Sequence, residues 1–144
     1  MDAANLMFGA ITLRDLRANA PLIKPVLALV KRACEYSSEG FTVDGVTNGL
    51  ISGRFRLWVV AAPPADLQAV AVGQAIAYDD GERELSIPLI GGPNVNALLN
   101  FLPDFAKAAA AWDCLRFKLY GPSRWDHKPA FGRRPASSVY EADA

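Results

Sequence analysis

The segment "SIPLIGGPNVNALLNFLPDF", from Ser86 to Phe105, decides how this sequence is interpreted. An apolar strand pattern runs into Gly91 and Gly92, and the pattern of an amphipathic helix begins at Asn94. A strand, a glycine turn and a helix N-terminus often bind phosphate, because glycines let backbone amides approach an anion. Pro93 has no amide, however, and Asn94 is a good helix N-cap. We therefore predict a structural turn, with a phosphate site as the alternative.

The composition is that of one globular domain. The chain has 144 residues, of which 51% are hydrophobic and 21% are charged. Its 15 basic and 15 acidic residues cancel, so no global field directs it to nucleic acid or a membrane. No signal-peptide pattern or bilayer-length apolar run is found, so we expect synthesis in a reducing cytoplasm. Cys34 and Cys114 lack the neighbours of a metal or redox motif, so we expect buried thiols and no metal site.

The first part of the chain predicts one strand and two helices. Residues Ile11–Leu16 alternate between apolar and polar, which is typical of a short strand. Residues 19–37 place apolar side chains at helical spacing, and Pro25 predicts that this helix starts late or bends. A second, short helix is expected from an N-cap at Thr42 to Gly53.

Three strands are expected to follow as an antiparallel meander. The first two are the apolar runs at residues 55–62 and 69–78. Asp80 and Gly81 separate the second run from the third, and this pair is a hairpin signal because both residues tolerate positive φ.

The last part of the chain adds a helix and two strands. An apolar stripe from Asn94 to Trp112 predicts a helix, which Pro103 should kink or split. Residues 114–121 read as a strand, parallel to the preceding one because a helix connects the two. Residues 122–132 are irregular or helical, and residues 135–142 form the last strand.

Several stretches of the sequence carry a family resemblance. They are "TVDGVTNGLISGRFRLWVV", "VGQAIAY", "ELSIPLIGG" and the ending "LYGPSRWDHKPAFGRRPASSVYEADA". Together with the order of elements, they resemble the GNAT acyltransferase superfamily, and most closely the GNAT-like proteins of tailed bacteriophages. The resemblance covers about residues 10–142 and implies a single α/β domain over residues 1–144. Its mixed, mostly antiparallel sheet would have about six strands flanked by helices.

The resemblance also implies where a cofactor would bind. In active GNAT enzymes a [QR]xxGx[GA] pattern at the strand-to-helix turn holds the pyrophosphate of acyl-coenzyme A. This sequence lacks the initial Gln or Arg and the second glycine, so we expect no cofactor, or acetyl-CoA if the protein is an enzyme. Pro88 cannot donate to an acyl carbonyl, whereas the next two amides can. The candidate cofactor-binding residues are Leu89, Ile90, Gly91, Gly92 and Asn94.

Acyl transfer to an amine needs a base and an acid, which the resemblance puts near the ends of the fourth and fifth strands. Glu84 is the candidate base, and Tyr120 or Ser123 is the candidate acid. A solvated or rim position is the alternative for each. His127 has no partner pattern for a triad or a metal, so we expect it at the surface.

A local basic stretch lies between Arg116 and Arg134, where six Lys or Arg residues accompany one acidic residue, Asp126. Basic residues interleaved with aromatic ones are typical of protein interfaces, and a solvated face is the alternative. The candidate interface residues are Arg124, Trp125, Lys128, Phe131, Arg133 and Arg134.

These features lead to one hypothesis and two alternatives. The hypothesis is a non-catalytic structural or assembly component of a tailed-phage virion, binding other phage structural proteins or copies of itself. The first alternative is a cytoplasmic, acetyl-CoA-dependent N-acetyltransferase acting on a small amine or a protein lysine. A nucleic-acid-associated factor is the second, and it rests only on the basic stretch. No membrane association is expected.

Overall fold

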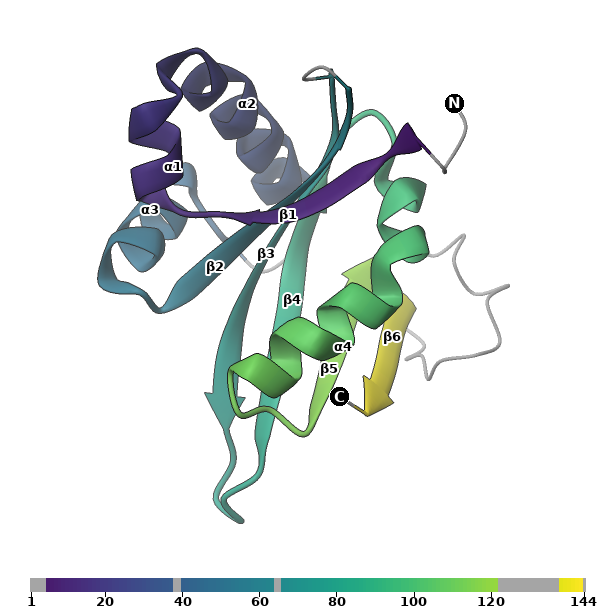
Figure 1. Ribbon diagram of the computed structural model, residues 1–144. Coiled ribbons are helices and arrows are strands. Elements are labelled where there is room, and N and C mark those ends of the chain that lie inside the picture. The colour runs from purple at the N-terminus through teal and green to yellow at the C-terminus, as the bar shows by residue number, and fades with distance from the viewer. Residues whose placement is uncertain (1–4, 38–39, 64–65, 122–137, 144) are drawn as a thin grey trace. The chain divides into compact units, whose positions relative to one another are not determined.

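The computed structural model describes residues 5–37, 40–63, 66–121 and 138–143, the last range by its backbone. Figure 1 shows the elements in chain order. The strands are β1 (Met7–Ile11), β2 (Phe55–Ala62), β3 (Asp66–Ala77), β4 (Arg83–Gly91), β5 (Arg116–Gly121) and β6 (Ser138–Asp143). The helices are α1 (Leu13–Ala18), α2 (Ala20–Tyr36), α3 (Val43–Ser52), the 3₁₀ helix η2 (Val95–Phe101) and α4 (Leu102–Ala111).

The described strands form one six-stranded sheet in the order β1-β2-β3-β4-β5-β6. β1 pairs antiparallel with β2, β4 pairs parallel with β5, and β5 pairs antiparallel with β6. β2, β3 and β4 are neighbours joined by short connections, which only antiparallel strands allow. The predicted mixed, mostly antiparallel sheet is therefore confirmed, including the parallel step.

The chain divides into two compact units. The first unit contains residues Met1–Val72 and Leu89–Phe101, and the second contains Gly73–Pro88 and Leu102–Ala144. β3 and β4 each run from one unit into the other. The two units are described separately below.

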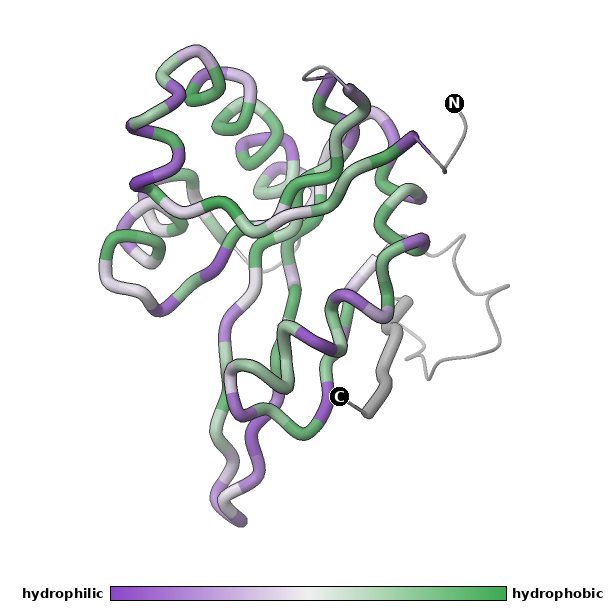
Figure 2. The backbone as a smooth tube through the Cα atoms, in the orientation of Figure 1, coloured by the Kyte–Doolittle hydropathy of each residue, from purple (hydrophilic) through white to green (hydrophobic). Residues whose placement is uncertain are grey.

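The core of the first unit forms around α2, as the spacing of apolar residues predicted. Val26 and Val30 of α2 are buried against strand residues that include Leu57 and Val70. Hydrophobic and hydrophilic colours alternate along α2 in Figure 2, as expected for a helix with one buried face. The helix begins at Ala20, ahead of Pro25, so the predicted late start is wrong. Pro25 has no amide, so one helical hydrogen bond is missing. Its acceptor would have been a carbonyl in the first turn of α2.

The predicted strand at residues 11–16 is wrong. The strand β1 ends at Ile11, and α1 follows directly. The cause is a capping box, in which the Asp15 amide donates to Thr12 Oγ1 over 3.1 Å and the Thr12 amide donates to Asp15 Oδ2 over 2.9 Å. These bonds satisfy amides that have no partner at the start of a helix. They therefore favour a helix here over the strand that the alternating pattern predicted.

The second helix was predicted correctly. Thr42 is the N-cap of α3, and its Oγ1 accepts a hydrogen bond from the Gly45 amide over 3.0 Å. Gly53 ends the helix with a left-handed φ of 80°.

The second unit contains the predicted hairpin and one packed helix. At the hairpin, the Gly81 amide donates to the Tyr78 carbonyl over 2.9 Å, and Gly81 has φ of 86°. In α4, Phe105 is fully buried, and its ring centroid lies 6.1 Å from that of Phe117 on β5. The hairpin and the apolar side of this unit thus follow the sequence pattern.

The long helix predicted from Asn94 to Trp112 is divided in two, as Pro103 suggested. The 3₁₀ helix η2 gives way to α4 at Leu102, and Pro103 occupies the first turn of α4. A proline is tolerated there because the amides of a first turn have no partner within the helix.

Candidate functional site

The parallel pairing of β4 with β5 sorts polar and apolar side chains onto opposite faces of the second unit. Paired residues point to the same face, and Glu84 is opposite Arg116 while Ser86 is opposite Lys118. The alternate positions are buried and apolar: Leu85, Ile87, Phe117 and Leu119. One face therefore carries a row of charged and polar groups from two adjacent strands.

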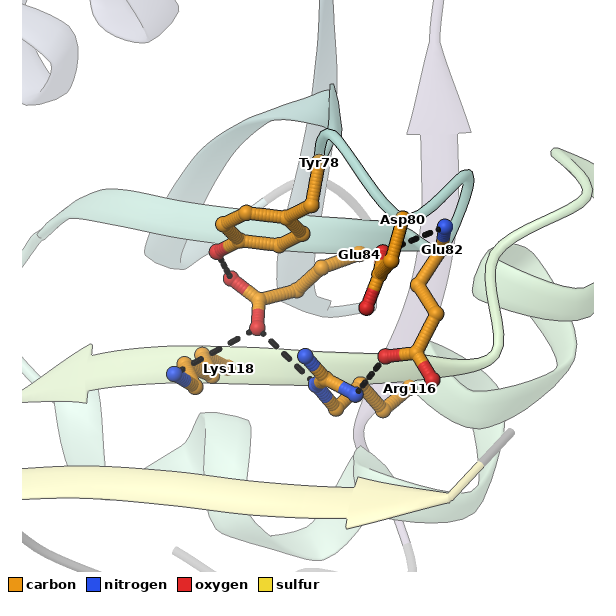
Figure 3. Close-up of polar contacts among 6 residues, drawn as sticks. All are labelled: Tyr78, Asp80, Glu82, Glu84, Arg116 and Lys118. Carbon is orange, nitrogen blue, oxygen red and sulfur yellow. Dashed lines mark hydrogen bonds and ion pairs between the residues drawn. The ribbon is translucent and has the colours of Figure 1, made fainter.

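Glu84 is the centre of this polar face. Only 1% of the residue is exposed, so its predicted alternative as a solvated residue is wrong. The Tyr78 hydroxyl donates to Glu84 Oε2 over 3.1 Å, and Arg116 Nε donates to Oε1 over 3.2 Å. Lys118 Nζ lies 3.4 Å from the same Oε1. Figure 3 shows the three partners converging on the carboxylate, so both of its oxygens are occupied.

A second carboxylate extends the cluster toward the hairpin. Arg116 Nη1 donates to Glu82 Oε2 over 3.0 Å, and the Glu82 amide donates to Asp80 Oδ1 over 2.9 Å (Figure 3). Two carboxylates, Glu82 and Glu84, thus accompany two cations, Arg116 and Lys118. Pairing of this kind offsets the cost of burying charge.

The cluster also sets the ionisation of its members. Desolvation raises the pKa of Tyr78, and the hydrogen bond to Glu84 raises it further. Hydrogen bonds to Glu82 and then Glu84 raise the pKa of Arg116. At neutral pH, Tyr78 is therefore a neutral donor and Arg116 is a cation.

The other candidates for acid–base chemistry are placed as follows. Tyr120 is half-buried on β5, two residues after Lys118, and its side chain falls on the same face by strand alternation. Ser123 lies outside the described residues, as does His127. The six candidate interface residues between Arg124 and Arg134 also lie outside them.

The parallel pairing of β4 and β5 ends before either strand does. The paired residues run from Glu84 with Arg116 to Ile87 with Leu119. The next residues of the two strands are Pro88 and Tyr120. Pro88 has no N–H to donate, which explains why the ladder stops at this position.

The glycine turn belongs to the first unit, and both glycines are required by close packing. A Cβ on Gly91 would lie 2.8 Å from the Leu29 carbonyl oxygen and 2.8 Å from the Ala33 amide nitrogen of α2. Gly92 has φ of 134°, and its Cβ would lie 2.4 Å from the Gln68 carbonyl oxygen of β3. The glycines let the end of β4 approach α2 and β3.

Two positions of the same turn have no amide to offer an anion. The Asn94 amide donates to the Gln68 carbonyl over 3.0 Å, and Pro93 has no amide. The Asn94 carbonyl accepts from the Ala97 amide over 3.1 Å as η2 begins. Before the turn, Leu89 is buried and Ile90 is half-buried on β4. Pro93 and Asn94 therefore offer no amide to an anion, whereas Leu89 and Ile90 remain candidates by their place on β4.

The sequence interpretation missed the partners of Glu84. Tyr78, Glu82, Arg116 and Lys118 were not expected to surround it. A signal was present, because polar and apolar residues alternate over residues 84–87 of β4 and residues 116–119 of β5. Together with the parallel pairing, which was predicted, this alternation puts the polar side chains of both strands on one face, but it does not set which of them are opposite each other.

The described part of the chain was also searched for a metal site and for a membrane-spanning helix. There, no group of three or more His, Cys, Asp or Glu side chains is arranged to hold a metal ion. No helix within the described ranges is both long and apolar enough to cross a membrane. Of the two thiols, Cys114 is buried as expected, and Cys34 is half-buried.

Comparison with known proteins shows the fold. No model of a protein family and no curated protein matches the sequence. Among solved structures, a probable acetyltransferase matches with a TM-score of 0.56 at 14% identity, over 86% of this chain and 83% of that one. A GNAT-family acetyltransferase from Listeria monocytogenes matches with a TM-score of 0.55 at 9% identity, over 96% and 95%.

A third solved structure is spermidine N-acetyltransferase from Vibrio cholerae in complex with CoA and spermine. It matches with a TM-score of 0.53 at 12% identity, over 97% of this chain and 96% of that one. The chain therefore has the α/β fold of GNAT acetyltransferases, as its sequence predicted. The closer likeness to phage-encoded proteins finds no support in these comparisons.

Proposed function

We propose that this chain is a GNAT-type N-acyltransferase that transfers an acetyl group from a thioester donor, such as acetyl-CoA, to a small amine or a protein lysine. The fold supports this proposal because the structures it resembles are acetyltransferases. The observation that carries the proposal is the end of the β4–β5 pairing at Ile87 and Leu119. In the GNAT superfamily, separation of these two strands admits the pantetheine arm of the donor.

The residues fit one part of such a donor and not another. We expect an extended, amide-containing arm to bind where the β4–β5 ladder ends, beyond Ile87 and Leu119. At the glycine turn, Pro93 lacks an amide and that of Asn94 is bonded to Gln68, so two positions that could hold a pyrophosphate offer it no donor. We therefore assign the donor's recognition to its pantetheine arm and expect weaker binding than a phosphate-holding turn would give.

Within this proposal, the candidate residues take different roles. Tyr120 is the candidate acid, since it directly follows Leu119, the last residue of β5 that pairs with β4. Glu84 is a positioning residue, because both of its oxygens are already bonded and it orients Tyr78 and Arg116. The amides of Leu89 and Ile90 remain the candidates for polarising the acyl carbonyl.

A kinetic experiment tests the proposal. Purified protein is assayed for acetyl transfer from acetyl-CoA to spermidine and to a lysine peptide, and Tyr120→Phe is compared with Tyr36→Phe. Tyr36 is 75% exposed at the end of α2, so it serves as the matched control. We expect Tyr120→Phe to lower kcat about 100-fold, the usual contribution of a positioned acid, without raising KM. Equal activity of the two variants would remove Tyr120 from the mechanism, and no transfer by the unchanged protein would refute the proposal.

A second candidate function rests on the same turn. If the missing amides of the turn prevent donor binding altogether, the fold serves as a non-catalytic assembly component of a tailed-phage virion. Its partners would be other phage structural proteins or copies of itself. Detection of the chain in stoichiometric amount in purified particles, together with no acetyl-CoA binding at millimolar concentration, would favour this function. Its absence from particles would exclude the virion location.

A further inference from the structure

The first unit contains an apolar cavity of about 200 Å³ that is lined by α1, α2, α3 and β2 and is partly open to solvent. Figure 1 shows these three helices grouped beside β2. Its deepest lining residues are Val26, Val30, Val46 and Leu57, each no more than 1% exposed. Toward the surface the lining includes Thr47, which is half-buried, and Arg17, which is exposed. The cavity therefore has an aliphatic floor and a polar rim.

The size of this cavity suits a small aliphatic chain. An engineered protein cavity of about 150 Å³, lined by similar side chains, stays dry and binds benzene. A cavity of about 200 Å³ therefore accommodates on the order of six to eight carbon atoms. Water gains little in such a space, because the aliphatic floor offers it no hydrogen-bond partners.

Arg17 determines which chemical class would bind. It is the one charged residue among the described residues that line the cavity. Its neighbour Asp15 is engaged in the capping box with Thr12, and no ion pair to Arg17 is found in the part of the chain that the structure describes. A guanidinium matches the geometry of a carboxylate, with which it forms paired hydrogen bonds.

We propose that this cavity binds an aliphatic monocarboxylate of about six to eight carbons, with its chain on the valine and leucine floor and its carboxylate on Arg17. The cavity lies wholly within the first unit, and the proposal does not depend on acyl transfer. It would give the protein a ligand site separate from the polar face of β4 and β5.

A chain-length series tests the size of the site. Calorimetric titration of the full chain with butanoate, hexanoate, octanoate and decanoate should show affinity rising about fourfold for each added methylene. The rise should stop at about eight carbons, when the cavity is full. A series without any rise, or one that continues unbroken to decanoate, would contradict a site of this size. No binding by any member would refute the proposal.

Four variants test its location and charge. Val46→Phe and Thr47→Leu each fill the cavity and should weaken octanoate binding at least about tenfold. Thr47→Leu is the milder change, so it still tests the location if Val46→Phe does not fold. Arg17→Gln should weaken octanoate about tenfold and leave 1-octanol unchanged, whereas Arg14→Gln on the same helix should change neither. Unchanged binding in both filled variants would overturn the location. Equal effects of Arg17→Gln and Arg14→Gln would overturn the assignment of the carboxylate.

Discussion

Arg116 on β5 lies directly opposite Glu84 on β4, and its Nε donates to Glu84 Oε1 over 3.2 Å. The carboxylate is buried, and its other oxygen accepts from the Tyr78 hydroxyl. A parallel pair of strands is thus held in register by a charge-assisted bond as well as by its backbone ladder. The predictions below follow from this cluster, from the glycine turn and from the end of the ladder.

Replacement of Glu84 by glutamine should destabilise the fold strongly. The change removes the negative charge that compensates Arg116 and Lys118, and the Lys118 side chain is only 10% exposed. Breaking a buried pair typically costs about 3 kcal/mol, and we expect a loss of that order in the free energy of unfolding. Urea unfolding at pH 7 measures it.

The matched control is Glu82→Gln. Glu82 contacts the same guanidinium, but its side chain is 43% exposed, so we expect a loss of less than about 1 kcal/mol. Equal losses for the two variants would show that burial of Glu84 does not decide the stability of the cluster.

Tyr78 should make the stability of the protein depend on alkaline pH. Because desolvation and the bond to Glu84 raise the pKa of this phenol, the folded state holds the proton more tightly than the unfolded state. The contribution of Tyr78 to the free energy of unfolding is therefore complete below the ordinary tyrosine pKa of about 10. It is lost as pH rises through the higher pKa of the folded state.

A comparison with Tyr78→Phe isolates this effect. Above about pH 10, the difference in unfolding free energy between the original protein and the variant should shrink as pH rises. Absorbance of tyrosinate in the folded protein should also lose its latest-titrating component in the variant. A difference that is constant with pH would contradict the role of this hydrogen bond.

Gly92→Ala should destabilise the first unit. The residue has φ of 134°, and an added Cβ would lie 2.4 Å from the Gln68 carbonyl oxygen. We expect a loss of roughly 2–3 kcal/mol, because an unfavourable φ is combined with a backbone clash. Gly9→Ala is the control, since nothing lies within 4 Å of its added Cβ, and it should change stability by less than about 0.5 kcal/mol. Thermal unfolding of both variants decides, and a neutral Gly92→Ala would show that the turn is not tightly packed.

Much of the fold could be predicted from the sequence because its signals are local. Thr42 and Gly53 bound α3 with the cap chemistry that their side chains dictate, and Gly81 closes the hairpin by its positive φ. The exception is instructive. Residues 11–16 alternate like a strand, but the Thr12 and Asp15 capping box favours a helix. The two signals compete, and the sequence alone does not say which is stronger.

The site could be predicted only in part, because its partners are distant in sequence. Glu84 and Arg116 are 32 residues apart, and the helix connection fixes their direction but not their register. The role of the glycines was likewise hidden, since Gly91 and Gly92 are constrained by backbone atoms of α2 and β3 rather than by their neighbours in the chain. From Pro93 and Asn94 the sequence predicted a poor phosphate cradle, and in the structure the Asn94 amide donates to the Gln68 carbonyl.

Donor binding tests the central claim most directly, and it is best measured by parallel calorimetric titrations with acetyl-CoA and S-acetylpantetheine. We predict that both bind, with affinities within about tenfold of each other, because Pro93 and Asn94 offer no amide to the pyrophosphate. At a hundred times its Kd, acetyl-CoA should add about 2.7 kcal/mol to the unfolding free energy. Failure of both ligands to bind at millimolar concentration would contradict an acyltransferase, and a preference for acetyl-CoA of a thousandfold or so would contradict the account of the turn.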